Sequence, residues 1–393
     1  MAVKPFDKSI LALAAAAFAV VTTEFSIVGI LPDVARDLDV SVPTAGLLVT
    51  LFAFTVALAG PFLTMLAGKI ERRRLFVGLL LVLAAGNIIA ALAENFTIMV
   101  IGRIIPALAL PVFWSIASTS AARLAGSENA GQAISVVFYG VSGATILGMP
   151  LGALIADAVG WRTSFLVIAG LSVAMAMALA AVFPRLEAEA EQNTASARTL
   201  LASRPFLGHL ALSGAVLTAL FTAYTYLSDV LQTIGGMGGG TAGWVLMGFG
   251  TVGLLGNWLA GKTVGQRPMA TSLIAAAVAA LGMAIAIPAL QAPMLAGIAL
   301  LLWGVAQSAS FVANHVRVIQ AAPHSQDLAA SLNVSVYNVG IGLGAIIGGE
   351  VIATVGLSNV GIAGGLIVAV TLAVIFLLSR WAPQQSAAPL VQN

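Results

Sequence analysis

The sequence predicts an all-α polytopic membrane protein with twelve transmembrane helices in two pseudo-symmetric six-helix halves. Three observations lead to this prediction. Of the 393 residues, 60% are hydrophobic and only 8% are Asp, Glu, Lys or Arg, whereas soluble proteins contain about 25% charged residues. The apolar residues fall in long blocks, without the alternation that barrel strands show. Finally, spaced glycines repeat between the two halves of the chain.

The apolar blocks have the length of membrane spans, because a bilayer core of about 30 Å needs roughly 20 helical residues. Twelve spans are expected at 9–31, 43–66, 75–93, 97–122, 132–156, 162–183, 206–228, 241–261, 270–290, 294–319, 328–354 and 359–380. The first block is longer than the apolar core of about 7–15 residues in a signal peptide. We therefore expect it to be a span of the mature protein.

Basic residues predict the orientation of these spans, because Lys and Arg concentrate in cytoplasmic loops. With a cytoplasmic N-terminus, fourteen of the seventeen Lys and Arg residues lie on the inner side, Arg36 and Arg162 lie outside, and Arg103 lies within a span. Both termini are thus predicted to be cytoplasmic. The expected units are a half at 1–183, a cytoplasmic linker at 184–205, a half at 206–381 and a cytoplasmic tail at 382–393.

An internal repeat supports the division into halves. Leu66-Ala67-Gly68-Lys69 after the second span recurs as Leu259-Ala260-Gly261-Lys262 after the eighth. In the fifth and eleventh spans, three glycines recur at an offset of 196, because Gly148, Gly152 and Gly160 align with Gly344, Gly348 and Gly356. Parallel repeats of this kind are typical of transporters that rock two halves around a central site.

Five motifs in the expected spans resemble those of the major facilitator superfamily. They are Thr22-Thr23-Glu24-Phe25 with Gly29–Ala35, the loop from Gly68 to Arg73, Arg103, the segment Gly143 to Gly152, and Gly160–Phe165. The chain is most similar to the twelve-span drug:proton antiporter branch, particularly to bacterial sugar efflux transporters of the arabinose/IPTG-exporting kind. The resemblance covers nearly the whole chain.

Two motifs depart from the pattern of that superfamily. In the loop after the second span, Gly68 replaces the expected Asp and Glu71 the second Gly, while Lys69, Arg72 and Arg73 keep the basic positions. In the fourth span, Ala107 replaces a Gly. The missing Asp leaves open whether the loop makes its usual charge pairing, and whether Glu71 substitutes for it.

The resemblance implies a proton-coupled antiporter that exports a small neutral polar solute, sugar-like or drug-like. It also implies a bacterial cytoplasmic (inner) membrane protein that acts as a monomer, with protons, lipids and a small-molecule substrate as partners. The proton gradient would be the energy source, with no cofactor. The segment Gly143–Gly152, with Gly148 and Pro150, is similar to a motif that symporters generally lack.

Glu24 and Arg103 are the candidate proton-coupling residues. A charge in the membrane interior costs at least about 2.5–3.5 kcal/mol and so usually marks a pathway or a pair. By helical rise, Glu24 lies about 22 Å and Arg103 about 21 Å from the cytoplasmic side. We expect Glu24 to take up and release the coupling proton. The alternatives are a static ion pair and a direct contact between Glu24 and substrate.

Polar residues near mid-membrane are the candidate substrate ligands, because transporter sites lie between the halves. They are Glu24, Tyr139, Gln307 and Asn338, with Tyr224 and Tyr226 nearer the outer side. Each could instead form an interhelical hydrogen bond or, for the two tyrosines near the outer side, belong to the interfacial aromatic belt. His315 and Arg317, at the inner edge of the tenth span, are expected to reach water.

The glycine-rich spans are expected to be packing or sliding surfaces. The residues concerned are Gly143, Gly148, Pro150 and Gly152 in the fifth span, and Gly344 and Gly348 in the eleventh. Small residues let helices approach closely, which suits either motion or static packing.

Several functions are excluded or disfavoured by what the sequence lacks. It contains no Walker motif, no Ser nucleophile elbow, no cysteine and no metal-ligand spacing, so ATP hydrolysis, catalysis and metal binding are not expected. The dispersed basic residues suit lipid rather than nucleic acid. A passive facilitator, an uptake symporter and a non-transporting sensor or scaffold remain as alternatives.

Overall fold

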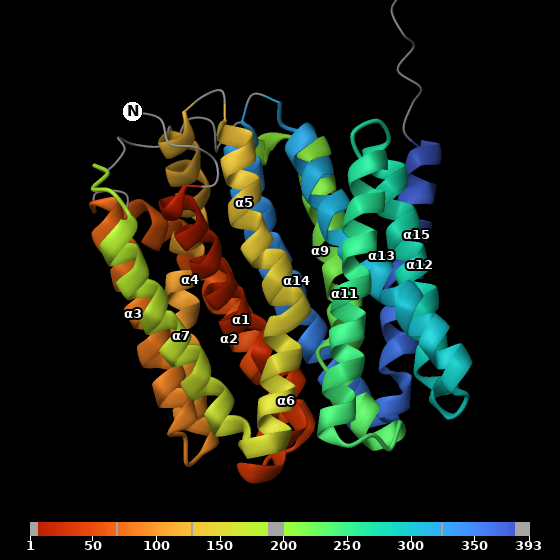
Figure 1. The fold of residues 1–393 in the computed structure, drawn as a ribbon. Coiled ribbons are helices and arrows are strands. Elements are labelled where there is room, and N and C mark those ends of the chain that lie inside the picture. The colour runs from red at the N-terminus through yellow and green to blue at the C-terminus, as the bar shows by residue number, and fades with distance from the viewer. Residues whose placement is uncertain (1–6, 68–69, 127–128, 188–199, 324, 382–393) are drawn as a thin grey trace, which may run out of the picture.

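The computed structural model describes residues 7–67, 70–126, 129–187, 200–323 and 325–381. It confirms an all-α membrane protein with twelve helices, within these residues, that are long and apolar enough to cross a bilayer. The helices run side by side between an upper end, where α1 begins, and a lower end (Figure 1).

The helices form two groups along the chain. The first group contains α1 (Lys8–Asp37), α2 (Val42–Ala67), α3 (Arg72–Ala91), α4 (Phe96–Ala125), α5 (Ala130–Gly143), the π-helix η1 (Ala144–Gly148), α6 (Met149–Val159) and α7 (Trp161–Val182). The second contains α9 (Arg204–Tyr224), α10 (Leu227–Asp229), η2 (Val230–Ile234), α11 (Gly239–Thr263), α12 (Pro268–Ala286), η3 (Pro288–Gln291), α13 (Pro293–Gln320), α14 (Gln326–Val355), η4 (Leu357–Asn359) and α15 (Val360–Trp381). The exact domain boundaries given above stay a prediction.

Local signals fix where several of these helices begin and end. The side chains of Asp7 and Asn95 accept hydrogen bonds from backbone N–H groups in the first turns of α1 and α4, as capping residues do. Gly160 and Gly356 end α6 and α14 with φ angles of 92° and 96°, a conformation that suits glycine. Because these two glycines are repeat partners, the same local device ends the equivalent spans.

The repeated glycines pack against equivalent positions on the first helix of their own group. A Cβ on Gly148 would lie 2.5 Å from Thr22 Oγ1 on α1, and one on Gly344 would lie 2.6 Å from Thr218 O on α9. Thr22 and Thr218 are themselves 196 residues apart. The same offset relates the neighbours of Gly152 and Gly348, which are Ser26 and Thr222. The repeat is thus present in the packing as well as in the sequence.

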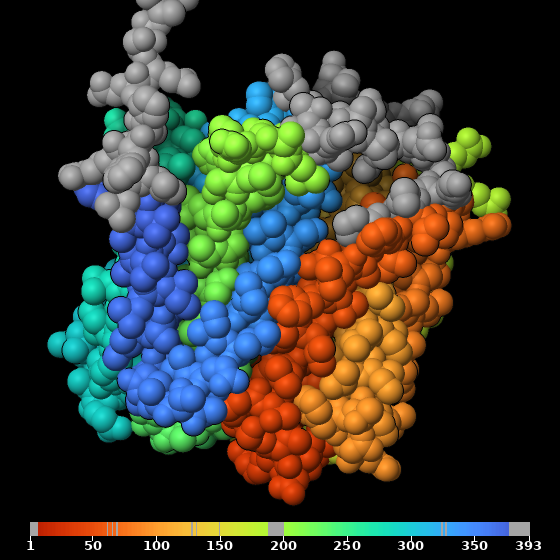
Figure 2. Space-filling view, turned by 180° about the vertical axis from the view of Figure 1, so that it is seen from behind, coloured from red at the N-terminus to blue at the C-terminus, as the bar shows by residue number. Residues whose placement is uncertain are grey.

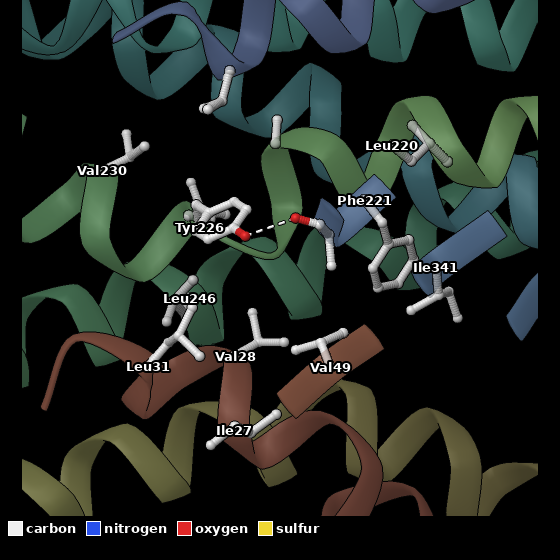
Figure 3. Close-up of a cluster of buried hydrophobic side chains, with 14 of the residues drawn as sticks. Ile27, Val28, Leu31, Val49, Leu220, Phe221, Tyr226, Val230, Leu246 and Ile341 are labelled. Atoms are coloured by element: carbon white, nitrogen blue, oxygen red, sulfur yellow. Dashed lines mark hydrogen bonds between the residues drawn. The ribbon is translucent and has the colours of Figure 1, made fainter. Parts of the chain in front are cut away.

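Among the described residues, a hydrophobic core shared between the groups lies toward the lower end. One buried cluster joins residues of α1 and α2, such as Ile27 and Val49, to residues of α9, α11 and α14, such as Phe221, Leu246 and Ile341; Figure 3 shows these side chains facing one another. Toward the upper end, each group has its own cluster: Ile10, Phe76, Phe113 and Phe183 in the first, and Phe206, Leu210 and Val318 in the second.

Direct contacts between the groups follow the same division. On α2, Thr50 Oγ1 donates to Gly342 O of α14 at 3.1 Å, and Ser228 Oγ of α10 donates to Gly29 O of α1 at 2.8 Å. Toward the upper end of α2, the side chains of Leu58, Phe62 and Leu66 are exposed. In Figure 2, α2 and α14 touch low on the molecule and diverge above. Within the described residues, the two groups therefore contact each other toward the lower end, and α2 and α14 separate toward the upper end.

Candidate functional site

Arg103 on α4 is buried in the first group and is held by the backbone of α1. Its side chain is 1% exposed. Nη1 donates to Thr23 O at 2.6 Å and Nη2 to Glu24 O at 2.9 Å. The guanidinium also lies 4.5 Å from the ring centroid of Phe52 on α2, a favourable cation–π distance. Arg103 thus joins α1, α2 and α4 at one level of the bundle.

The carboxylate of Glu24 lies next to this anchor but does not bind it directly. Within the described residues, the ion pairs are Asp33–Arg36 and Asp37–Arg162, and Glu24 forms neither an ion pair nor a side-chain hydrogen bond. Glu24 and Arg103 still interact electrostatically through space. The static ion pair considered above is therefore not formed in this conformation.

Asn87 on α3 is a polar residue of this site that our sequence analysis missed. It is 1% exposed and its Nδ2 donates to Thr23 Oγ1 at 3.2 Å and to Leu83 O at 2.8 Å. The backbone carbonyl of Thr23 also accepts a hydrogen bond from Arg103. Two buried polar side chains therefore hold α1 at the same residue. The signal that could have identified Asn87 was a lone amide within an apolar span.

A chain of aromatic rings leads from the residue after Glu24 into the second group. Phe25 lies 6.1 Å from Phe221, which lies 5.3 Å from Tyr224. Tyr224 stacks on Phe249 at 5.7 Å, and Phe249 meets Trp303 at 5.3 Å. These rings come from α1, α9, α11 and α13, so they connect the Glu24 region to the centre of the second group.

The structure brings some of the predicted substrate ligands together and separates others. Gln307 joins the aromatic chain because its Oε1 accepts from Trp303 Nε1 at 2.8 Å. Asn338 is 4% exposed and its Oδ1 has no hydrogen-bond partner. Tyr139 on α5 is 65% exposed and is not one of the rings that connect Phe25 to Trp303. Gln307 and Tyr224 thus lie along the same series of aromatic side chains, and Tyr139 does not.

Tyr226 is a packing residue in this conformation. It has no exposed surface, and its hydroxyl donates to Ala345 O at 2.7 Å (Figure 3). A Cβ on Gly46 of α2 would lie 2.1 Å from that hydroxyl, so Tyr226 sits between the two groups and cannot contact a ligand here.

The glycines of the fifth span face α1 along its length. A Cβ on Gly143 would lie 3.3 Å from the ring of Phe18, and one on Gly152 would lie 3.6 Å from Ser26 Cβ. Pro150 is buried two residues after the π-helix η1. The structure thus places this segment in close contact with α1, and whether it slides stays a prediction.

The loop motif after the second span is only partly described, because Lys69 lies outside the described residues. Glu71 is the N-cap of α3, and its carboxylate accepts from the backbone N–H groups of Arg73 and Arg74 at 2.9 and 3.1 Å. The backbone N–H of Arg72 donates to Leu186 O at 3.0 Å. Partial desolvation acts to raise the pKa of Glu71, but the backbone hydrogen bonds outweigh it and hold the pKa below its usual value.

The expectation that Arg317 reaches water is wrong. Its side chain is 1% exposed. Neutral hydrogen-bond acceptors on three helices surround the guanidinium. Sequence position alone placed Arg317 at the end of a span, but the packing of α9 and α12 over this end of α13 covers it. No cluster of three or more potential metal ligands occurs in the described part of the chain.

Together, twelve membrane-spanning helices in two groups, close glycine packing and an internal carboxylate beside a buried arginine are the features of a membrane transporter. Residues 13–333 match the family model of the Major Facilitator Superfamily. The chain belongs to this family.

Comparisons with individual proteins agree with this assignment. The chain is 34% identical over 367 residues to a protein of Mannheimia succiniciproducens described as a "Probable sugar efflux transporter", covering 92% of this chain and 91% of that protein. Its fold is similar to a bacterial homologue of the human lysosomal transporter Spinster in an inward-facing, unoccupied conformation, with a TM-score of 0.79, 16% identity, and 95% and 96% of the two chains covered. It is also similar to a D-xylose–proton symporter, with a TM-score of 0.71, 17% identity, and 94% and 96% covered.

Proposed function

We propose that the protein is a proton-coupled exporter of a small neutral polar solute, and that Glu24 carries the coupling proton. The observation that carries the proposal is the state of the Glu24 side chain, which lies inside the bundle with no hydrogen bond or ion pair among the described residues. An ionised carboxylate without partners is costly in an apolar interior, and proton uptake removes this cost. Glu24 is therefore suited to bind a proton in one stage of a transport cycle and release it in another.

The proposed direction of transport rests on the orientation of the chain. With Lys and Arg residues concentrated at the upper end, this end is the cytoplasmic one of a bacterial inner membrane. The contact between the two groups would then lie on the outer side, as expected of an exporter that loads its solute from the cytoplasm. The 34% identity to a protein described as a sugar efflux transporter supports the same direction.

The proposed substrate is a hydroxyl-rich solute, with sugars first and nucleosides or amphenicol-type antibiotics next. Neutral donors and acceptors lie close to the aromatic rings that lead away from Phe25, including Tyr224 and Gln307. Such groups suit hydroxyls, which both donate and accept hydrogen bonds. The curated relative's description supports sugars.

The test is reconstitution in liposomes with an imposed pH gradient, followed by addition of sugars, nucleosides and antibiotics. We expect substrate-triggered proton movement that falls at least tenfold in Glu24→Gln, while exchange of labelled for unlabelled solute persists because it needs no net proton transfer. The matched control is Glu94→Gln, which alters an exposed carboxylate between α3 and α4 and should behave as the unmodified protein.

Two outcomes would contradict the proposal. Uphill export by Glu24→Gln would remove the coupling role from this residue. Solute flux without any proton movement in the unmodified protein would instead indicate a passive facilitator.

A further inference from the structure

A second buried arginine lies in the second group, near the end of α13. Arg317 Nε donates to Ser272 Oγ at 3.2 Å on α12, and Nη2 donates to Asn314 Oδ1 at 2.8 Å. On α9, Nη2 donates to His209 O and Ser213 Oγ, each at 3.1 Å, and Nη1 lies 2.8 Å from His209 Nδ1. One side chain therefore holds three helices together at the upper end.

The contact with the imidazole fixes the protonation state of His209. A guanidinium can only donate hydrogen bonds, so His209 Nδ1 must accept and the ring must be neutral, with its proton on Nε2. A protonated imidazole has two donors and no acceptor. Proton uptake would therefore replace this hydrogen bond by a contact between two donors and two positive charges.

Among the side chains that the structure describes, no carboxylate forms an ion pair with His209 or Arg317. The charge that acts on His209 is that of Arg317. The helices around His209 also carry other titratable or charged groups: Arg204 and Tyr224 on α9, Arg267 just before α12, His315 on α13, and Tyr337 and Glu350 on α14. Asp327 at the start of α14 and Arg380 on α15 have side chains outside the described part of the structure. Tyr337 donates its hydroxyl to Phe311 O. His209 is only half-buried and lies five residues from the start of α9, so its ring is not sealed inside the bundle.

We propose that His209 is a proton-responsive positioning residue, which holds the upper ends of α9, α12 and α13 together through Arg317 only while its ring is neutral. Acid on the upper side then loosens the second group and slows transport. This role is separate from the coupling role of Glu24 and does not rest on it.

The test compares melting temperatures of the purified protein in detergent between pH 8 and pH 5. His209→Gln keeps a neutral acceptor for Arg317 but cannot take up a proton. This variant should therefore lose part of the fall in melting temperature that acid causes in the unmodified protein. We expect the unmodified protein to lose at least about 3 °C more than His209→Gln over this range. His315→Gln is the matched control, because this histidine contacts Asn333 rather than Arg317, and it should follow the unmodified protein.

Further variants keep the proposal open to refutation. If His209→Gln does not fold, His209→Asn offers a similar neutral acceptor. The proposal would be overturned if His209→Gln or His209→Asn kept the full pH dependence of the melting temperature seen in the unmodified protein. It would also be overturned if His315→Gln lost that pH dependence. Glu24→Gln should retain the pH-dependent melting whatever it does to transport, so failure of one proposal is distinguishable from failure of the other.

Discussion

Buried arginines in this protein are held by backbone carbonyls of neighbouring helices. Arg103 donates to Thr23 O and Glu24 O, and Arg317 donates to His209 O. A helical carbonyl can accept a second hydrogen bond beside its own intrahelical one, because its oxygen has two lone pairs. Arg103 can therefore anchor α4 to α1 whether or not Glu24 is ionised, as the proposed coupling role of Glu24 requires.

Glu71 should stabilise the protein as the N-cap of α3. Its carboxylate accepts from the N–H groups of Arg73 and Arg74, and loss of a cap costs about 1 kcal/mol. We expect Glu71→Ala to lower the melting temperature at pH 7 by about 2–4 °C, with the exposed Glu94→Ala as a control that changes it little.

The stabilisation of α3 by the Glu71 cap should weaken in acid. The backbone hydrogen bonds hold the pKa of Glu71 below its ordinary value. The contribution of the ionised cap to the free energy of unfolding is therefore complete above the ordinary pKa of a glutamate. It is lost as the pH falls through the lower, folded-state pKa. The difference in melting temperature between the unmodified protein and Glu71→Ala should thus shrink in acid, and a constant difference would contradict this account.

At the scale of elements, the fifth span contains an irregular turn. The span passes from α5 through the π-helix η1 into α6, and Pro150 is the second residue of α6. Proline lacks an N–H group and its ring clashes with the carbonyl four residues earlier, so a wider local turn accommodates it. The same turn brings Thr145 O close to α11, where a Cβ on Gly250 would lie 2.5 Å from it. An irregular turn thus forms part of the contact between the groups.

The glycine contact between α14 and α9 should be sensitive to a single methyl group. A Cβ on Gly348 would lie 2.3 Å from Thr222 O, a backbone atom that cannot rotate away. We expect Gly348→Ala to destabilise the protein by about 1–3 kcal/mol through overpacking, measured by thermal unfolding. The control is Gly208→Ala on α9, where no atom lies within 4 Å and alanine favours the helix. Equal melting temperatures for the two variants would contradict close packing at Gly348.

At the scale of the whole molecule, the two groups share one core toward the lower end and keep separate cores toward the upper end. The two groups are therefore joined through buried side chains at one end of the molecule. Transport by alternating access requires the shared lower contact to open and an upper contact to form. The exposed side chains of Leu58, Phe62 and Leu66 on α2 are available for such a contact.

A disulfide across the lower contact should therefore stop transport. A Cβ on Gly243 of α11 would lie 3.5 Å from Ala153 Cβ of α6, within the range that disulfides need. Because the chain has no cysteine, Ala153→Cys/Gly243→Cys can be oxidised without side reactions. We expect solute flux to fall at least tenfold on oxidation and to recover on reduction.

The matched control for this crosslink lies within one group. A Cβ on Gly365 of α15 would lie 3.7 Å from Ala284 Cβ of α12, so Ala284→Cys/Gly365→Cys should form a disulfide and still transport. Undiminished flux in the oxidised Ala153→Cys/Gly243→Cys protein would show that the lower contact need not open.

Some features followed from the sequence because they depend on local chemistry. A span must be apolar and long enough to cross the hydrocarbon core, so all twelve could be located, although the seventh continues through α10 and η2 to Ile234, beyond its expected end. Repeat spacing identified the partners of Gly148 and Gly152 before their packing was known. The family, too, was identified from motifs around Glu24 and Arg103.

Other features depend on how each helix is rotated and tilted against its neighbours, and only the tertiary structure decided them. It showed that Arg103 binds the backbone of α1, that Tyr226 lies between the groups, that Asn87 reaches Thr23 and that Arg317 is covered by α9 and α12. Hydropathy specifies that a helix spans the membrane, but rotation and tilt are set by side-chain packing between helices. The sequence by itself determined which residues lie in the membrane, and tertiary packing determined which of them meet.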